Sequence, residues 1–421
     1  MIAVLLYACS DRRQSVTDFK DYESYLSLSQ AVSSNPVNEE LKFWNDRLKK
    51  NGDEASLIKL GALHSELFKE TGLVEHIVLS DSLYKQAQKR NPDGLVEIYQ
   101  ALAANAISRH KFQVAKEYAE KALSVEDKKS ASLLILADVS LEIGDYARAN
   151  QILQQFKNKR SFAYLIRKAK VKDHEGMLDS AIACMEQAYQ RVRGNKALSQ
   201  WALSNLGDMY GHAGRIEESY AAYLTVLRND PSDDYSLKGI AWIALSHDNK
   251  IKDAKRIINT LAARKRMPEL HLMLAEIAHL EGKTLEKTNQ LKIFRSLASA
   301  PAYRQMYLKY LALLEAEEFN NASAAVSMAV EEINNRSTPQ SFDLLAWAYY
   351  HQNKFKEAFE VATKHVEHQT FEPDAVYHLG MIYHANGNHE KGDQYLKEAL
   401  KSHFELGPST AARIEAAIES L

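Results

Sequence analysis

Residues 203–231 read LSNLGDMYGHAGRIEESYAAYLTVLRNDP, and this stretch predicts two helices joined by a tight turn. Apolar or small residues recur every three or four positions on each side of Gly214, which places each set on one helical face. Gly214 suits the left-handed conformation that follows a helix C-terminus. Pro231 cannot continue a helix interior, so the second helix ends before it. The segment is therefore predicted to be one helical hairpin.

This hairpin pattern recurs along the chain with a nearly constant period. A small residue in the second helix marks most units, and successive units are about 35 residues apart. The marked positions are Ala115, Ala149, Ala181, Ser219, Ala254, Lys287, Ala322, Ala358 and Gly392. Lys287 departs from the pattern, as does Glu317 at an expected turn glycine, so looser packing is expected around them. Such a period predicts a solenoid in which each unit packs against its neighbours.

The composition excludes several other classes of protein. Gly and Pro together supply 24 of the 421 residues, about half of average usage, whereas sandwiches and propellers need many turn formers. Lys plus Arg is 53 and Asp plus Glu is 55, and this balance disfavours nucleic acid as the main ligand. Two cysteines cannot by themselves form a disulfide framework or a zinc site.

The hairpins resemble the tetratricopeptide repeat, whose signature is W-x2-L-G-x2-Y on the first helix and A, F or Y, A and P on the second. The matching residues include Leu203, Leu206, Gly207, Tyr210, Ser219, Tyr223 and Pro231, then Leu345, Ala346, Tyr349, Ala358 and Ala362, and finally Val376, Leu379, Gly380, Tyr383, Gly392, Leu396 and Ala399. The resemblance covers about residues 53–406. It implies an all-α, right-handed superhelical solenoid of about nine to ten helix-turn-helix units.

The pattern divides the chain into five parts. We expect a signal-peptide end and lipobox at 1–9, a polar tether at 10–35, N-terminal helices and a divergent first repeat at 36–95, the repeat array at 96–406, and a capping helix at 408–421. The capping helix is expected because the last repeat of a solenoid otherwise exposes an apolar face.

The N-terminus carries a possible modification site. Residues 2–8 are all apolar, too few to span a bilayer but as many as the shortest signal-peptide apolar regions. The sequence Leu6-Tyr7-Ala8-Cys9 resembles a bacterial lipobox. That resemblance implies lipidation at Cys9 and a place in the bacterial cell envelope, on the outer membrane or the periplasmic face. The alternative is a cytoplasmic chain with an unmodified Cys9.

No sequence motif indicates catalysis, a cofactor or a metal. The chain lacks GxGxxG, GxxxxGK[ST], HExxH and GxSxG. Histidines recur near the ends of first helices, but equivalent helices lie about 8–10 Å apart, too far for a shared zinc ion with ligands at about 2 Å. We therefore predict neither catalytic residues nor a cofactor or metal site.

The resemblance also implies a surface for a partner, because first helices line the concave face in this family. Exposed first-helix positions are predicted to be Trp201, Asp208, Tyr307, Asp343, Trp347, Tyr350, Tyr377, Met381 and His384. Aromatic and Met side chains suit a binding surface; alternatively, some of them pack between helices. The leading hypothesis is a non-enzymatic scaffold that binds a protein or peptide. The alternatives are a lipoprotein that binds a small molecule or glycan and a cytoplasmic regulator that senses a peptide.

Overall fold

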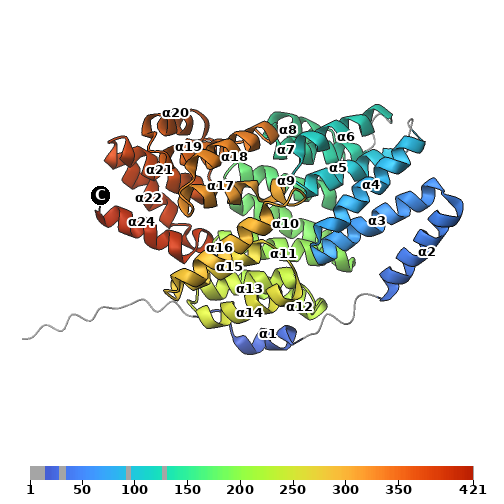
Figure 1. Ribbon diagram of the computed structural model, residues 1–421, viewed down its shortest axis with the longest axis horizontal. Coiled ribbons are helices and arrows are strands. Elements are labelled where there is room, and N and C mark those ends of the chain that lie inside the picture. Colours follow the sequence, from blue (N-terminus) through green and yellow to red (C-terminus); the bar gives the residue numbers. More distant parts are fainter. Residues whose placement is uncertain (1–14, 28–34, 92–95, 126–129, 421) are drawn as a thin grey trace, which may run out of the picture.

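The computed structural model describes residues 15–27, 35–91, 96–125 and 130–420, and within these ranges every regular element is a helix (Figure 1). The predicted all-α solenoid is confirmed. At the N-terminus lie α1 (Phe19–Leu26) and α2 (Asn35–Asn51), followed by the first pair, α3 (Glu54–Thr71) and α4 (Val74–Arg90). None of the described helices has the length and apolar character needed to cross a bilayer.

The remaining helices follow in hairpin pairs and end in two extra helices. The pairs are α5 (Val96–Ser108) and α6 (Phe112–Val125), α7 (Ser130–Glu142) and α8 (Tyr146–Gln154), α9 (Phe162–His174) and α10 (Leu178–Val192), α11 (Lys196–His212) and α12 (Ile216–Asn229), α13 (Asp234–Ser246) and α14 (Ile251–Arg264), α15 (Glu269–Leu280) and α16 (Thr284–Ala298), α17 (Leu308–Glu317) and α18 (Ala322–Asn335), α19 (Pro339–His351) and α20 (Phe355–His365), and α21 (Pro373–Ala385) and α22 (His389–Leu400). A 3-10 turn, η1 (Arg304–Tyr307), precedes α17, and α23 (His403–Leu406) and α24 (Pro408–Ser420) complete the chain.

The hairpin of α11 and α12 shows why the small residues recur. A Cβ atom added to Gly207 would lie 2.5 Å from the ring of Tyr223, so the two helices approach too closely for a larger residue. The Ser219 hydroxyl donates to the Gly207 carbonyl at 2.7 Å and fixes this approach. Gly214 adopts φ 72° in the turn, as the sequence predicts.

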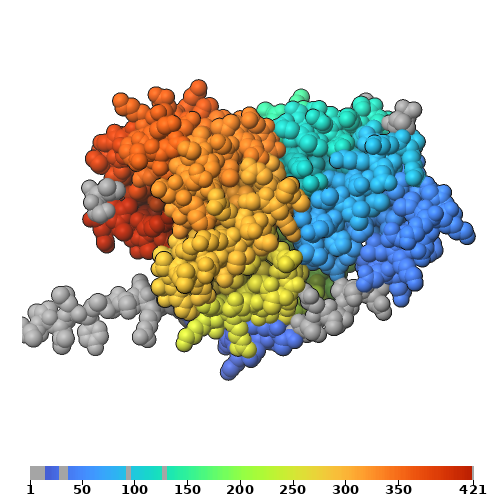
Figure 2. All heavy atoms as spheres, viewed as in Figure 1, coloured from blue at the N-terminus to red at the C-terminus, as the bar shows by residue number. Residues whose placement is uncertain are grey.

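The superhelix closes on itself, so that units far apart in sequence lie side by side. The Tyr303 hydroxyl donates to the Gly72 carbonyl across 231 residues, and the Asn335 side chain donates to the His110 carbonyl across 225 residues. Figure 2 shows the orange segments packed directly against the cyan segments along this boundary. We call this boundary the seam, meaning the contacts of 299–338 with 70–74 and 110–144.

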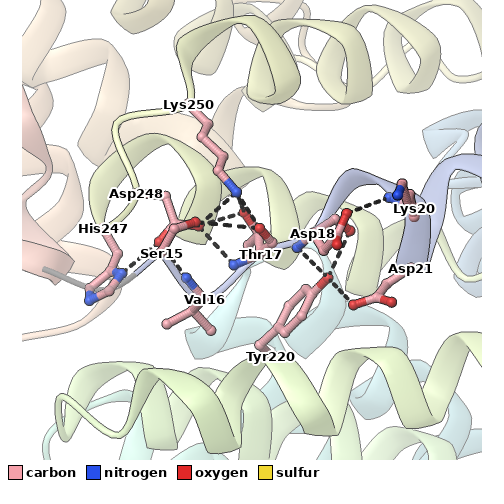
Figure 3. A network of polar contacts seen from close by, with 10 residues as sticks. All are labelled: Ser15, Val16, Thr17, Asp18, Lys20, Asp21, Tyr220, His247, Asp248 and Lys250. Carbon is pink, nitrogen blue, oxygen red and sulfur yellow. Dashed lines mark hydrogen bonds and ion pairs between the residues drawn. The ribbon is translucent and has the colours of Figure 1, made fainter.

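Residues 15–27 correct the prediction of a tether at 10–35. Helix α1 packs on α12 and α14, and the Tyr22 side chain is 0 % exposed within that core. Upstream of the helix, the Asp248 carboxylate accepts hydrogen bonds from the backbone N–H groups of Val16 and Thr17 (Figure 3). The segment is ordered because its aromatic residues complete an apolar core and its polar atoms find partners there. The rest of the predicted tether, 10–14 and 28–34, lies outside the described residues.

The C-terminal capping helix is confirmed as α24. Its Ile414 side chain is 0 % exposed and lies in a cluster with Leu396 and Ala399 of α22, the last helix of the array. The same cluster includes Trp347 and Tyr377 from first helices. The cap therefore covers part of the concave face as well as the end of the solenoid.

Candidate functional site: a cavity on the concave face

First helices of several units line an open cavity of about 590 Å³, which we call the concave cavity. Its wall comes mainly from α11, α13, α15, α17 and α21, and one side is formed by α23 and α24. Asp208, Trp242, Glu276 and Tyr310 all line it and lie 34 residues apart in sequence. They therefore occupy the same position in four consecutive units. The repeat itself builds the site, one side chain per unit.

The concave cavity is rich in carboxylates. Seven acidic residues line it, against three lysines and arginines: Asp208, Glu269, Glu276, Glu317, Glu318, Asp374 and Glu405 against Lys238, Lys309 and Arg413. The whole chain is nearly balanced, with 55 acidic and 53 basic residues. The excess of negative charge is thus a local property of this cavity.

Apolar and aromatic side chains form much of the remaining lining. Trp242, Met273, Tyr310 and Leu313 come from first helices, and Tyr310 is 46 % exposed. The Trp242 indole Nε1 donates to the Phe404 carbonyl at 3.0 Å, which fixes the indole beside the C-terminal segment. Aromatic rings next to carboxylates suit a ligand with both apolar and polar parts.

The C-terminal segment is built into the concave face by close contacts. A Cβ atom added to Gly211 would lie 2.7 Å from the Phe404 ring, so this ring needs a glycine opposite it. The backbone N–H of Ser409 donates to Glu276 at 3.0 Å. Arg413 of α24 donates to Glu317 at 3.0 Å. The chain's own C-terminus thus occupies one side of the surface on which a partner was expected.

The carboxylates of the cavity differ in their electrostatic surroundings. Burial raises the pKa of Glu405, the nearby Glu372 and Asp374 raise it further, and only His212 opposes them. Burial would also raise the pKa of Glu317, but Arg413 and the hydrogen bond from Trp347 outweigh it and hold the pKa below its usual value. The site therefore contains both compensated and uncompensated carboxylates.

Only Asp208 and Tyr377 of the predicted partner-binding residues line the concave cavity. Asp208 accepts hydrogen bonds from the hydroxyls of Tyr223, at 2.5 Å, and Tyr235. Tyr377 is 6 % exposed and lies under the capping helix. The structure thus brings two of the nine residues to one site and distributes the others around it.

Trp347 and Asp343 correct the prediction of exposed first-helix positions, because their side chains are buried. Trp347 is 2 % exposed, stacks on His378 with ring centroids 4.0 Å apart, and donates its Nε1 to Glu317 at 2.9 Å. His378 in turn contacts the Asp343 carboxylate at 2.9 Å. Tyr350 is half-buried and stacks on the Trp347 indole, with ring centroids 4.7 Å apart. These residues support the wall of the cavity from behind.

The other four predicted residues lie elsewhere. His384 is buried, not exposed as predicted, because it packs against Gly392 and bonds to Asp393 at 2.9 Å. Met381 is half-buried and packs in the cluster under α24. Tyr307 donates to the cavity residue Glu269 without lining the cavity itself. Trp201 is 42 % exposed but lies outside the cavity.

Sequence reasoning missed Trp242, Glu276 and Tyr310, although a signal was present. Each follows Asp208 by one, two or three steps of 34 residues, so extending that position through the next units would have identified them. The predicted lipidation site, Cys9, lies outside the described residues. Within the described ranges, no three His, Cys, Asp or Glu side chains are grouped so as to hold a metal ion.

Comparison with known proteins supports the repeat. A tetratricopeptide repeat family model matches residues 131–161, and another matches 373–402. No curated protein matches the sequence. The solved structures named below are at most 20 % identical to this chain and concern the fold only.

Three of them illustrate the range. PilF of Pseudomonas aeruginosa is 13 % identical, with 50 % of this chain and 96 % of that chain covered and a TM-score of 0.37. A tetratricopeptide repeat protein of Thermus thermophilus is 20 % identical, with 45 % and 98 % covered and a TM-score of 0.38. The human IFIT1 dimer with PPP-AAAA is 13 % identical, with 92 % and 95 % covered and a TM-score of 0.44.

Proposed function

We propose that this solenoid of tetratricopeptide-type hairpins is a non-enzymatic scaffold that binds a protein or peptide segment in its concave cavity. The observation that carries the proposal is the row of Asp208, Trp242, Glu276 and Tyr310, one from each of four consecutive units. A peptide laid along the concave face meets one of these side chains per unit. Aromatic and charged groups of this kind provide contact area and orientation for a polypeptide.

The charge of the cavity favours a polypeptide over a nucleic acid. With seven carboxylates against three basic side chains, the lining repels phosphate groups. A protein or peptide partner has no such obstacle, because its charge varies with its sequence. The absence of nucleic acid among the partners is thus part of the proposal.

The proposal is tested by placing a photo-crosslinking amino acid at position 310, inside the cavity, and at position 117 as a control. Tyr310 lines the cavity, whereas Glu117 is exposed on α6 and lies outside it. Irradiation in extracts of the native cells should attach a defined polypeptide at 310 and none at 117. A small molecule or glycan attached at 310 would contradict the proposal, as would equal products at both positions.

We further propose that the protein is lipid-anchored through Cys9 in the bacterial cell envelope. The resemblance of Leu6–Cys9 to a lipobox supports this part. Stable anchoring takes at least two membrane signals, which a thioether-linked diacylglycerol plus an amide-linked acyl chain would supply. Cys9→Ser should release the native gene product from the membrane fraction. A soluble native product with an unmodified Cys9 would contradict the anchor.

A further inference from the structure

We infer that the segment bound in the concave cavity is positively charged and enters it with Lys or Arg side chains. The inference rests on the proposed function and adds the chemical class of the partner. Three observations carry it. The basic side chains of the cavity all form salt bridges, whereas three of its carboxylates do not. Arg413 of the chain itself already binds a carboxylate of the cavity. The aromatic side chains of Trp242 and Tyr310 line the same cavity.

Every basic side chain of the cavity is already paired with a carboxylate. Lys309 lies 3.3 Å from Asp374, Lys238 lies 3.7 Å from Glu269, and Arg413 lies 3.0 Å from Glu317. Outside the cavity lining, Lys287 contacts Glu318 at 2.6 Å. Four of the seven carboxylates are therefore compensated by a cation of the chain.

The other three carboxylates form no salt bridge with a lysine or arginine in the part of the chain that the structure describes, although Arg413 lies near enough to Glu276 for electrostatic attraction. Asp208 accepts from two tyrosine hydroxyls, and Glu276 accepts from the backbone N–H of Ser409. Glu405 has a histidine, His212, at 3.9 Å. Three carboxylates around one cavity that form no salt bridge with a lysine or arginine leave a site that an incoming cation stabilises.

The surroundings of Glu405 agree with this deficit of positive charge. The pKa of Glu405 is raised, first by burial and then by the carboxylates of Glu372 and Asp374, while His212 lowers it. A lysine or arginine brought next to these groups would relieve the repulsion among them. A cationic partner would therefore stabilise the ionised form of the Glu405 carboxylate.

Arg413 shows how a carboxylate of this cavity binds a cation. Its guanidinium reaches from α24 to Glu317, which is held in place by the indole N–H of Trp347. A hydrogen-bonded carboxylate already oriented toward the cavity binds a guanidinium or ammonium group without further ordering. A partner's side chain can use Glu276 in the same way, because Glu276 also accepts a hydrogen bond that orients it, from the Ser409 backbone, and lines the same cavity.

The aromatic side chains in the cavity suit the long aliphatic parts of lysine and arginine side chains. Trp242 and Tyr310 flank Glu276 in the series of equivalent positions and both line the cavity. Their rings cover methylene groups and attract a cation placed over a ring face. An acidic segment would meet the same rings but would face three uncompensated carboxylates.

The test is a selection of peptides from a random heptapeptide display library on the purified full-length protein. Pools recovered from the unchanged protein should be enriched in Lys and Arg, and the best peptide should bind less tightly as the salt concentration rises. A pool that is neutral or acidic overturns the inference. An affinity that stays the same between 0.05 and 0.5 M salt also overturns the inference, because the screening length changes roughly threefold over that range.

A pair of charge-reversal variants assigns the binding to the cavity. Glu276→Lys should weaken the best peptide by at least about tenfold, whereas Glu117→Lys on α6 should leave its affinity unchanged. Glu276→Gln keeps the shape of the side chain, and it should weaken binding in the same direction if Glu276→Lys disturbs folding. Equal effects of Glu276→Lys and Glu117→Lys overturn the inference.

The two proposals fail in different ways. Suppose that the selected peptides are neutral and that the polypeptide crosslinked at position 310 competes with them for binding. The scaffold proposal would then stand, and only the inferred preference for positive charge would be wrong. If neither the library nor the crosslinker at 310 yields a polypeptide, both proposals are wrong.

Discussion

At the scale of single residues, Trp347 shapes the concave cavity without lining it. The indole is 2 % exposed, stacks on His378, and orients Glu317 through a hydrogen bond of 2.9 Å. Glu317 then receives Arg413 from the capping helix. A change at Trp347 therefore acts on stability first and on the cavity only through its neighbours.

Trp347→Ala should lower the free energy of unfolding by about 3–5 kcal/mol, because it leaves a large hole in a packed cluster. Trp201→Ala is the matched control: Trp201 is 42 % exposed, and its loss should cost less than about 1 kcal/mol. The shift of the urea midpoint, followed by circular dichroism, measures both. Equal shifts for the two variants would mean that Trp347 is not a packing residue.

Asp248 fastens the N-terminal segment in a way that depends on pH. Burial would raise its pKa, but hydrogen bonds from Thr17, Val16 and His247 outweigh burial and lower the pKa to about 2, from an ordinary 3.8. Because the folded pKa lies below the unfolded one, the stabilisation is present above pH 3.8. It is lost as the pH falls from 3.8 to about 2.

The size of that effect follows from the shift. A lowering from 3.8 to about 2 corresponds to about 2–3 kcal/mol at most, since one pKa unit is worth about 1.4 kcal/mol. Asp248→Asn should therefore destabilise the protein at neutral pH, and the gap to the unchanged protein should narrow in acid. Urea midpoints at a series of pH values measure it, with Glu117→Gln as control. A gap that stays constant down to pH 3 would rule out this role.

The sequence predicts these single residues only in part, for a geometric reason. Successive side chains point about 100° apart around a helix. An alignment error of one position therefore assigns a core residue to the concave surface, or the reverse. Asp208 lines the cavity as predicted, whereas the predicted Tyr307 belongs to the 3-10 turn before α17, and Tyr310 of α17 lines the cavity instead. Trp347 was expected on the concave surface and packs inside the wall.

At the scale of elements, the hairpins and the C-terminal helix α24 were predictable, whereas the packing of the N-terminal helix α1 was not. The contact of Gly207 with Tyr223 is local, so the residues that form it lie within one repeat of the sequence. By contrast, α1 meets Tyr220 across about 200 residues, with the Tyr220 hydroxyl donating to the Asp18 carbonyl at 3.2 Å. No periodic pattern links residues so far apart, and therefore a Ser-rich stretch with a few aromatics reads as a tether.

The capping helix α24 should be required for solubility. Removing residues 408–421 uncovers Trp347, Tyr377 and Leu396 and leaves Glu317 without Arg413. The truncated protein should bind an apolar dye strongly and aggregate, because a contiguous apolar face becomes exposed. Dye fluorescence and light scattering measure this.

Two point variants test whether the apolar contact made by α24, rather than the helix as a whole, stabilises the protein. Ile414 is 0 % exposed, so Ile414→Ala should destabilise by about 2–5 kcal/mol. The adjacent Glu415 is exposed, and Glu415→Ala should change stability by no more than about 0.5 kcal/mol. A soluble, dye-negative truncation would show that α24 does not act as a cap.

At the scale of the whole molecule, closure of the superhelix adds contacts that a solenoid of neighbouring units does not need. Arg336 lies 3.8 Å from Glu142 across the seam, and a Cβ atom added to Gly144 would meet the Ser337 carbonyl at 2.9 Å. The seam exists because small rotations between successive units accumulate until distant units meet. The period of the sequence predicts the stacking of units, but it does not state the rotation per unit, so the seam could not be predicted.

Asn335 is the residue on which the seam depends most directly. Its side-chain carbonyl accepts from the backbone N–H of Phe112 at 3.0 Å, and its amide donates to the His110 carbonyl at 2.8 Å. The Asn335 backbone carbonyl also accepts from Gln113 at 2.8 Å. One side chain thus satisfies two backbone groups of a turn that lies 225 residues away.

Asn335→Ala should therefore loosen both sides of the seam together. Losing the partners of partly buried backbone groups costs about 1–3 kcal/mol. Hydrogen exchange should accelerate at 110–113 and at 335–338 to the same extent, since each side protects the other. Asn289→Ala, at an exposed position within α16, is the control and should change neither segment. Faster exchange at 335–338 alone would mean that the two turns are protected independently, and that the superhelix is held closed by contacts other than Asn335.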